Sequence, residues 1–416
     1  MKCILRARLA RAVGLALAGL LAGCAPSPTA ETRATAVANA TNQPAPQVYR
    51  DWSFPSDGVT FSNRLDGARL NAVSRIAQDQ YRVTIAPESL PINPSPWYGF
   101  TVRSTHPRHL TIHFRYLHGK QRYTPKMSRD GKHWRIADKS EFSASDAGGS
   151  TLQVESEAQA LRVFAQIPVS HEDYTRWHSG LARQVEINDM LIGKSVDGRP
   201  LKAFTFGNPD SHKLLVVIGR QHPPETTGAR ALMTFVDTLV ADEPSARRFR
   251  EQMFTLVIPL MNPDGVASGN WRGNAHGQDL NRDWGPFREP ETRAARDSID
   301  QLLSYNERSL ALAIDFHSTW KDIFYIVKDD PSTAPGGVLQ QLVEQMRKRF
   351  PGQIRVKANA ATSSVFKNWV FRHYHAPAVT YEVGDRSVEG EVERHAEFAA
   401  NTIMSHLMHN HAHDHQ

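Results

Sequence analysis

Residues 214–225 read Leu-Leu-Val-Val-Ile-Gly-Arg-Gln-His-Pro-Pro-Glu. The apolar run at the start of this stretch, with its β-branched residues, predicts a strand that is buried on both faces. Gly and Pro then end the strand, which leaves His222 in a loop and Glu225 at the start of the next helix. An imidazole and a carboxylate directly after a buried strand are candidate metal ligands at the edge of a sheet.

Further apolar runs extend this pattern along the chain. They cover residues 254–260, 310–314 and 378–381, and helices are expected near 226–241, 289–304, 337–349 and 391–408. Buried strands that alternate with helices predict an α/β sheet covered by helices on both faces. Sites in such sheets lie at the carboxyl ends of the strands, where His317 and Glu382 follow two of the runs.

The chain upstream of residue 170 shows a different pattern, in which short runs of alternating apolar and polar residues are separated by turn residues. The runs are 81–85, 98–102, 110–116 and 161–167, with turns at 130–131 and 146–149. This alternation predicts an all-β sandwich domain over residues 47–168. At Ser170 the pattern changes, because Ser170-His-Glu-Asp173 is typical of a helix N-cap. A second domain is therefore expected over residues 169–408.

The N-terminus is typical of an exported lipoprotein. Basic residues precede the apolar run 12–21, which is too short to span a bilayer. The tetrapeptide Leu21-Ala-Gly-Cys24 resembles the bacterial lipoprotein cleavage box, which implies a signal peptide over 1–23, a lipidated Cys24 and a flexible tether over 24–46. Ala25 implies, by the same resemblance, anchoring in the outer membrane of a bacterial cell envelope, facing the periplasm. Ordinary cleavage beside a chance cysteine is the alternative.

Charge and cysteine content narrow the class of protein. The chain carries 49 basic and 43 acidic residues, but part of the excess lies in the predicted signal peptide, which contains no acid. The remainder is close to neutral, so a nucleic-acid partner is not expected. The cysteines are Cys3, which leaves with the signal, and Cys24. No disulfide is therefore expected to stabilise the folded part.

A cluster of polar motifs lies between the two candidate histidines. It comprises Asn262-Pro-Asp-Gly265, Asn270-Trp-Arg272 and Asp279-Leu-Asn-Arg282. With the flanking His-x-x-Glu, His-Ser and Glu motifs, this order resembles the zinc carboxypeptidases of the carboxypeptidase A type over roughly residues 170–405. Residues 91–98, Pro-Ile-Asn-Pro-Ser-Pro-Trp-Tyr, resemble the β-domain of the cytosolic carboxypeptidase branch, so the chain looks like a bacterial, exported relative of that branch.

The resemblance implies a zinc site and a general base. His222, Glu225 and His317 would hold one Zn²⁺ per chain, and Asp279 would orient His222 from behind. Glu382 would activate a zinc-bound water as the general base. The implied fold is a carboxypeptidase-like mixed sheet with helices on both faces.

The resemblance also implies how substrate is held. Arg272 would stabilise the oxyanion, while Asn281 and Arg282 would bind the terminal carboxylate of a peptide. Counting back 15 residues from the general base, to the position where the family sets side-chain preference, gives Lys367. A lysine there would favour an acidic C-terminal residue, and an exposed helix lysine is the alternative.

One family residue has no counterpart. The tyrosine that closes over substrate in the digestive enzymes falls on Ala360, and Trp369 and Tyr374 are candidate substitutes. Trp97 and Tyr98 in the first domain would either contact a partner or lie in its core.

The sequence thus predicts a zinc metallocarboxypeptidase that removes C-terminal residues, acidic ones among them, from peptides with a free terminal carboxylate. One alternative is a cell-wall peptide amidase that cuts a γ-D-glutamyl-diaminopimelate bond. Another is a catalytically silent lipoprotein that binds peptide or glycan. The His-rich tail over 409–416 would either bind metal loosely or stay solvated.

Overall fold

The structure is a computed structural model that describes residues 47–328, 330–333, 337–387 and 390–409. All of them belong to one compact unit. The predicted signal peptide, Cys24, the whole predicted tether and the tail beyond His409 lie outside the described residues. Within those ranges, no helix has the length and apolar character that crossing a bilayer requires.

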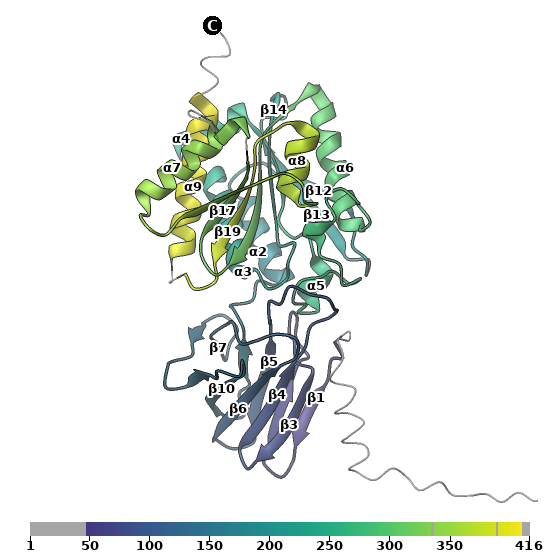
Figure 1. The fold of residues 1–416 in the computed structure, drawn as a ribbon, viewed down its shortest axis with the longest axis vertical. Helices are drawn as coiled ribbons and strands as arrows, with labels where there is room; N and C mark the ends of the chain where they lie inside the picture. The colour runs from purple at the N-terminus through teal and green to yellow at the C-terminus, as the bar shows by residue number, and fades with distance from the viewer. Residues whose placement is uncertain (1–46, 329, 334–336, 388–389, 410–416) are drawn as a thin grey trace, which may run out of the picture. The chain divides into compact units, whose positions relative to one another are not determined.

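Strands β1 to β11 form a β-sandwich, as predicted (Figure 1). One sheet has the strand order β1-β2-β5-β11-β7-β8 and the other has the order β3-β4-β6-β10-β9. The pairing is antiparallel except between β4 and β6. The bounds are β1 Asp51–Phe54, β2 Val59–Ser62, β3 Ala72–Ala77, β4 Gln80–Ile85, β5 Gly99–Ser104, β6 Arg108–Tyr116, β7 Lys126–Ser128, β8 Arg135–Ile136, β9 Phe142–Ala144, β10 Ser150–Ser156 and β11 Leu161–Phe164.

Alternate strand residues fill the core of this sandwich. In β2, for example, Val59 and Phe61 are buried and the residues between and after them are only half-buried. Trp97 and Tyr98 also lie in this core, the second of the two positions that the sequence left open for them. Trp271, more than a hundred residues beyond the last strand, is fully buried in the same core.

Strands β12 to β19 form a third, mixed sheet with the order β12-β13-β15-β14-β16-β19-β17-β18. The central strands β15, β14, β16 and β19 run parallel, and antiparallel pairs flank them. The bounds are β12 Asn188–Lys194, β13 Pro200–Gly207, β14 Lys213–Gly219, β15 Phe254–Ile258, β16 Ser309–Thr319, β17 Ile323–Val327, β18 Arg355–Asn359 and β19 Ala378–Gly384.

Helices cover both faces of this sheet (Figure 1). Helices α3, α4, α7 and α9 pack on one face, and α6 and α8 pack on the other. The bounds are α2 His171–Leu181, α3 Thr226–Val240, α4 Pro244–Gln252, α5 Pro263–Ala267, α6 Pro290–Ser304, α7 Val338–Arg349, α8 Phe366–Tyr374 and α9 Glu391–His409. Ser170 and Asp173 form a capping box at the start of α2, as the sequence predicted.

Residues 214–218 of β14 show why helices must pack on both faces of the sheet. Leu215 and Val217 point into the core on one face, whereas Leu214, Val216 and Ile218 point into the core on the other. Successive side chains of a strand alternate between faces, so a continuous apolar run is buried on both.

Two strands run further than their apolar cores suggested. β16 continues through Asp315 to His317, and β19 continues through Glu382. The sequence analysis placed Asp315, His317 and Glu382 just after the ends of these strands, but all three residues lie within the strands. Regular strand geometry, not a loop, therefore fixes the directions of their side chains.

Candidate active site

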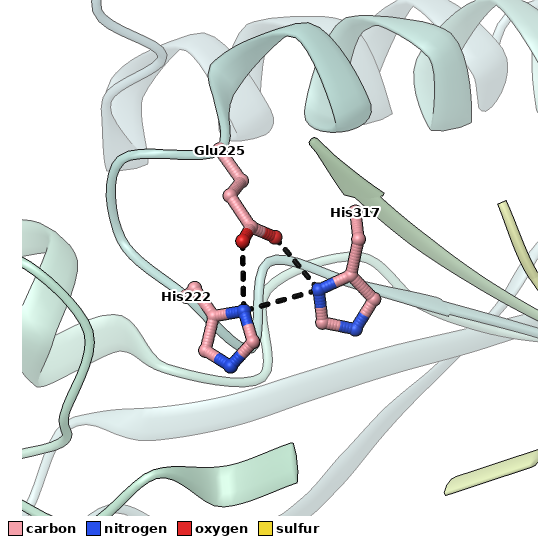
Figure 2. Close-up of side chains that lie close together, drawn as sticks. All are labelled: His222, Glu225 and His317. Carbon is pink, nitrogen blue, oxygen red and sulfur yellow. Dashed lines mark hydrogen bonds and ion pairs between the residues drawn. The ribbon is translucent and has the colours of Figure 1, made fainter. Parts of the chain in front are cut away.

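Three buried side chains meet at the carboxyl edge of the central parallel strands of the mixed sheet. His222 Nδ1 lies 2.8 Å from Glu225 Oε1, and His317 Nδ1 lies 2.7 Å from Glu225 Oε2. The two Nδ1 atoms are 3.1 Å apart, so all three side chains point at one spot (Figure 2). In the part of the chain that the structure describes, this is the one group of His, Cys, Asp or Glu side chains arranged to hold a metal ion.

Each of the three comes from a different kind of element. The loop after β14 carries His222, and Arg220 stabilises this loop by donating from Nε to the Pro223 carbonyl at 2.9 Å. Glu225 is the N-cap residue of α3, and His317 lies on β16.

Helix α3 lies very close to the strand that carries His317. A Cβ atom on Gly228 would come within 2.5 Å of the His317 carbonyl oxygen, so only glycine allows this approach. The close packing brings the start of α3, with Glu225, against β16.

The outer nitrogen of each imidazole faces a carboxylate. His222 Nε2 lies 2.9 Å from Asp279 Oδ1, and His317 Nε2 lies 2.8 Å from Asp315 Oδ2. A proton on each Nε2 satisfies these contacts and leaves both Nδ1 atoms free for a metal. Two imidazoles and one carboxylate, with room for a fourth ligand, are a donor set that suits Zn²⁺.

The charges within this cluster shift its pKa values. Burial alone would lower the pKa of His317, but Asp315 and Glu225 raise it well above its usual value. Burial would raise the pKa of Glu225, but His222 and His317 hold it far below its usual value. The site therefore favours an ionised Glu225, the form that binds a metal.

Glu382 lies beside this group. It is the register partner of His317 on the neighbouring strand β19, so the two side chains project from the same face of the sheet. Burial, and then the charge of Glu225, raises the pKa of Glu382 to about 7. Its Oε2 atom has no hydrogen-bond partner among the described residues.

A cavity of about 340 Å³ opens over these side chains. It is lined mainly by polar groups from the mixed sheet, from the helices and loops around it and from two loops of the sandwich: Asn93, Ser95, Arg122, His222, Glu225, Arg272, Asn281, Arg282, Ser318, Thr319, Tyr325, Asn359, Ser363, Val365, Lys367, Asn368, Thr380 and Glu382. The cavity therefore brings together two of the predicted metal ligands, His222 and Glu225, with the predicted base and substrate-binding residues, and His317 lies behind its wall, in contact with Glu225.

The predicted cationic residues differ in how they are held. Arg272 Nε donates to Asp279 Oδ2 at 2.6 Å, so Asp279 contacts both this arginine and His222. Arg282 is exposed, donates to the Asn281 carbonyl at 2.7 Å and forms no ion pair with another described side chain. Its guanidinium is thus available to a ligand. Asn281 accepts a hydrogen bond from the Phe366 amide at 3.0 Å, which fixes its orientation.

Lys367 is buried, contrary to the alternative of an exposed helix lysine. Its Nζ donates to Asn368 Oδ1 at 2.7 Å and lies 3.4 Å from the Ile326 carbonyl oxygen. Burial lowers the pKa of Lys367 to about 8, although Asp330 opposes the shift. The ammonium group therefore lies in the wall of the cavity with little solvent around it.

The candidate closing aromatics do not line the cavity. Trp369 packs against Trp284, and the Tyr374 hydroxyl donates to Asp300 at 2.7 Å. Tyr325, on β17, does line it. Its strand was not expected from the sequence, so no signal pointed to this residue.

Two further contacts in the site were missed. Asp315 lies two residues before His317, a spacing that identifies it once the strand is known to continue. Arg122 reaches the cavity from the sandwich and binds Asp385 at 2.5 Å, but no sequence pattern links residues so far apart.

Comparison with known proteins gives a family match. The family model described as zinc carboxypeptidase matches residues 183–399, more than half of the chain. Cytosolic carboxypeptidase 6 of Mus musculus is 33% identical over 136 residues, which cover 30% of this chain and 25% of that protein. Cytosolic carboxypeptidase 3 of the same species is 23% identical over 321 residues, covering 68% of this chain and 32% of that protein. The chain thus spans a third or less of the length of these relatives.

Solved structures share the fold over most of the chain. A metallo-carboxypeptidase from Burkholderia cenocepacia has a TM-score of 0.71 and 20% identity, covering 85% of this chain and 99% of that one. A metallo-carboxypeptidase from Pseudomonas aeruginosa, solved in complex with (2-guanidinoethylmercapto)succinic acid, has a TM-score of 0.69 and 24% identity, covering 83% and 99%.

Proposed function

Because this chain belongs to the zinc carboxypeptidase family, we propose that it is a zinc-dependent peptidase that releases the C-terminal residue of a peptide. The observation that carries the proposal is the cluster of His222, Glu225 and His317 at the floor of a polar cavity, with Glu382 beside His317 on the neighbouring strand. A cluster of this kind serves a hydrolytic reaction better than a structural role, because Oε2 of Glu382 is shielded from solvent and has no hydrogen-bond partner among the described residues.

The metal ligands we propose are His222, Glu225 and His317. Their Nδ1 and carboxylate oxygen atoms lie within 4.8 Å of one another, which suits a single ion. When bound, zinc supplies Lewis-acid chemistry by polarising a carbonyl and lowering the pKa of water. Asp279 and Asp315 hold the two imidazoles from the outer side.

Glu382 is the proposed general base. Its raised pKa, about 7, means that it can accept a proton from the attacking water and later donate one to the leaving amine. Arg272 lines the same cavity and offsets the negative charge that develops on the carbonyl oxygen. Its Nε is occupied by Asp279, so the remaining N–H groups are those that would serve the substrate.

The restriction to C-termini would come from Arg282 and Asn281. A guanidinium offers a planar pair of donors that matches a carboxylate. Arg282 lines the cavity and forms no ion pair with another described side chain, which leaves it for the terminal carboxylate of a peptide.

A preference for acidic C-terminal residues is the finer part of the proposal. Lys367 contributes a buried ammonium group to the cavity wall, and no carboxylate binds it directly among the described residues. A hydrogen bond to a charged group contributes about 1.5–3 kcal/mol. Lys367 would therefore favour Glu over an uncharged residue by about 10- to 150-fold in kcat/KM.

A membrane tether belongs to the proposal as well. The Leu21–Cys24 box supports lipidation of Cys24 and attachment to the outer membrane of a bacterial cell envelope. Mass spectrometry of the mature N-terminus tests this, since an unmodified Cys24 would refute it.

The decisive experiment is a peptide panel ending in Glu, Lys, Phe or diaminopimelate, with zinc-loaded wild type, Glu382→Gln and Lys367→Met. We expect zinc-dependent release that Glu382→Gln loses, and a Glu preference that Lys367→Met loses. Lys348→Met, an exposed lysine on α7, is the matched control and should change neither.

Other outcomes separate the rival functions. Release from the diaminopimelate peptide alone would indicate a cell-wall amidase. Binding of peptide or glycan without turnover, at one zinc per chain, would indicate a silent binding protein.

A further inference from the structure

A carboxylate of the β-sandwich binds the loop that carries Arg272. Glu88 lies just after β4, in the segment that leads to β5. Its Oε2 accepts a hydrogen bond from the Trp271 amide at 2.7 Å, and its Oε1 accepts hydrogen bonds from the Arg272 and Gly273 amides at 2.9 and 2.6 Å. Three successive backbone N–H groups thus converge on one carboxylate, an arrangement that favours an anion.

The same loop is held at a second point. The Trp271 side chain lies in the sandwich core, and its Nε1 donates to the Trp97 carbonyl at 3.0 Å. Next to it, Asn270 Oδ1 accepts a hydrogen bond from the buried Arg69 at 3.2 Å. The sandwich therefore holds the backbone on both sides of the Cα atom of Arg272.

The guanidinium end of Arg272 is held by Asp279, which belongs to the domain of the mixed sheet. Its Nε donates to Asp279 Oδ2, and Asp279 in turn contacts His222. With backbone and guanidinium both fixed, the long side chain has little freedom left. Ordering a flexible arginine before substrate arrives is what a charge-stabilising group requires.

We propose that Glu88 is a positioning residue for Arg272: by binding the amides of residues 271–273 it sets the point from which the arginine reaches the reacting carbonyl. This inference rests on the role of Arg272 in the proposed function. Glu88 does not itself line the cavity described above, so it acts through Arg272 and not on substrate. The sandwich is then a working part of the active site.

A double-mutant cycle tests the proposal. We would measure kcat and KM for the best peptide of the panel with wild type, Glu88→Ala, Arg272→Ala and the double variant, all zinc-loaded. Loss of an oxyanion-stabilising group lowers kcat by about 10²- to 10³-fold, the drop expected for Arg272→Ala. Misplacing that group costs somewhat less, so Glu88→Ala should lower kcat by about 10- to 100-fold with little change in KM.

The double variant separates positioning from general destabilisation. If Glu88 acts through Arg272, then Glu88→Ala should cause no further loss of kcat in the Arg272→Ala background. Equal losses in both backgrounds, or no loss in the wild-type background, would overturn the inference. If Glu88→Ala does not fold, Glu88→Gln takes its place in the cycle, because its NH2 group cannot accept the bond from the Trp271 amide and its uncharged oxygen binds the Arg272 and Gly273 amides more weakly. A smaller loss of kcat is then expected, and it too should vanish in the Arg272→Ala background.

Two controls complete the design. Tyr49→Phe removes another hydrogen bond across the same boundary, from the tyrosine hydroxyl to the Ala267 carbonyl at 2.9 Å, without touching the arginine loop. Its kcat should stay at the wild-type value, and a loss as large as that of Glu88→Ala would refute a specific role for Glu88. A wild-type kcat in Arg272→Ala alone would instead refute the proposed function of Arg272, so the two failures are distinguishable.

Discussion

Replacing Asp315 with asparagine should weaken zinc binding without slowing the zinc-loaded enzyme. Asp315 Oδ2 lies 2.8 Å from His317 Nε2 and accepts a hydrogen bond from Gln221 Nε2 at 2.8 Å. Asparagine keeps an oxygen at this position and nearly the same volume, so both hydrogen bonds are retained. The change removes the negative charge that makes the imidazole a stronger metal ligand.

The expected size of the effect follows from burial. Asp315 is 0% exposed and His317 is 1% exposed, so solvent does not screen their interaction. Loss of the outer partner of a metal-bound histidine lowers metal affinity by about 10- to 100-fold, or about 1.4–2.7 kcal/mol. Full burial points to the upper half of that range.

The assay is competition for zinc against a chelator of known affinity at fixed pH, followed by turnover at saturating zinc. Asp279→Asn is the informative comparison, because Asp279 also holds Arg272 and its loss should reduce both zinc affinity and kcat. Asp322→Asn is the control: Asp322 forms a buried pair with His395 away from the metal ligands. A zinc affinity of Asp315→Asn within about threefold of wild type would refute the reasoning.

Three further predictions concern other parts of the molecule. Burial lowers the pKa of Lys367 to about 8, and the protonated form of the lysine is the charged one. For a peptide ending in Glu, kcat/KM should therefore fall as pH rises through about 8. A peptide ending in Phe should not show this decline, and a decline shared by both peptides would contradict the assignment. Gly228→Ala should lower the free energy of unfolding by about 1–3 kcal/mol and weaken zinc binding, because the new Cβ meets the His317 backbone. Denaturant unfolding measures the loss of stability and chelator competition measures the loss of zinc affinity. Gly180→Ala in α2, where a Cβ meets no close atom, is the control. Trp271→Ala should lower the free energy of unfolding by about 3–5 kcal/mol, since the ring is fully buried, and a loss below about 1 kcal/mol in urea titration would contradict its place in the core.

The sequence predicted those elements whose pattern is strong and local. The runs around Leu214, Phe254, Leu310 and Ala378 are apolar because the sheet is covered on both faces, and that pattern identifies central strands without further information. The strand ends then led to the metal-binding and base candidates. Edge strand β18 escaped prediction because its residues are mostly exposed, so it shows neither alternation nor an apolar run.

Contacts between residues far apart in the sequence could not be predicted. Glu88 and Trp271 are 183 residues apart, and nothing in either local pattern points to the other. Lys367 had two equal interpretations, because a count along the chain does not tell which side of a helix faces a cavity. Lys367 is buried because α8 packs against β17, a contact that the sequence does not reveal.

The burial of Trp271 in the sandwich has a consequence for how the chain folds as it is synthesised. The sandwich strands end at Phe164, yet one of the largest side chains in their core is made more than a hundred residues later. At translation rates of about 5–20 residues per second, the nascent sandwich must wait roughly 5–20 s for that ring. During this interval the core of the sandwich lacks this ring, which is supplied only with the loop that carries Arg272. Completion of the N-terminal core and placement of the loop that carries Arg272 are therefore one folding event.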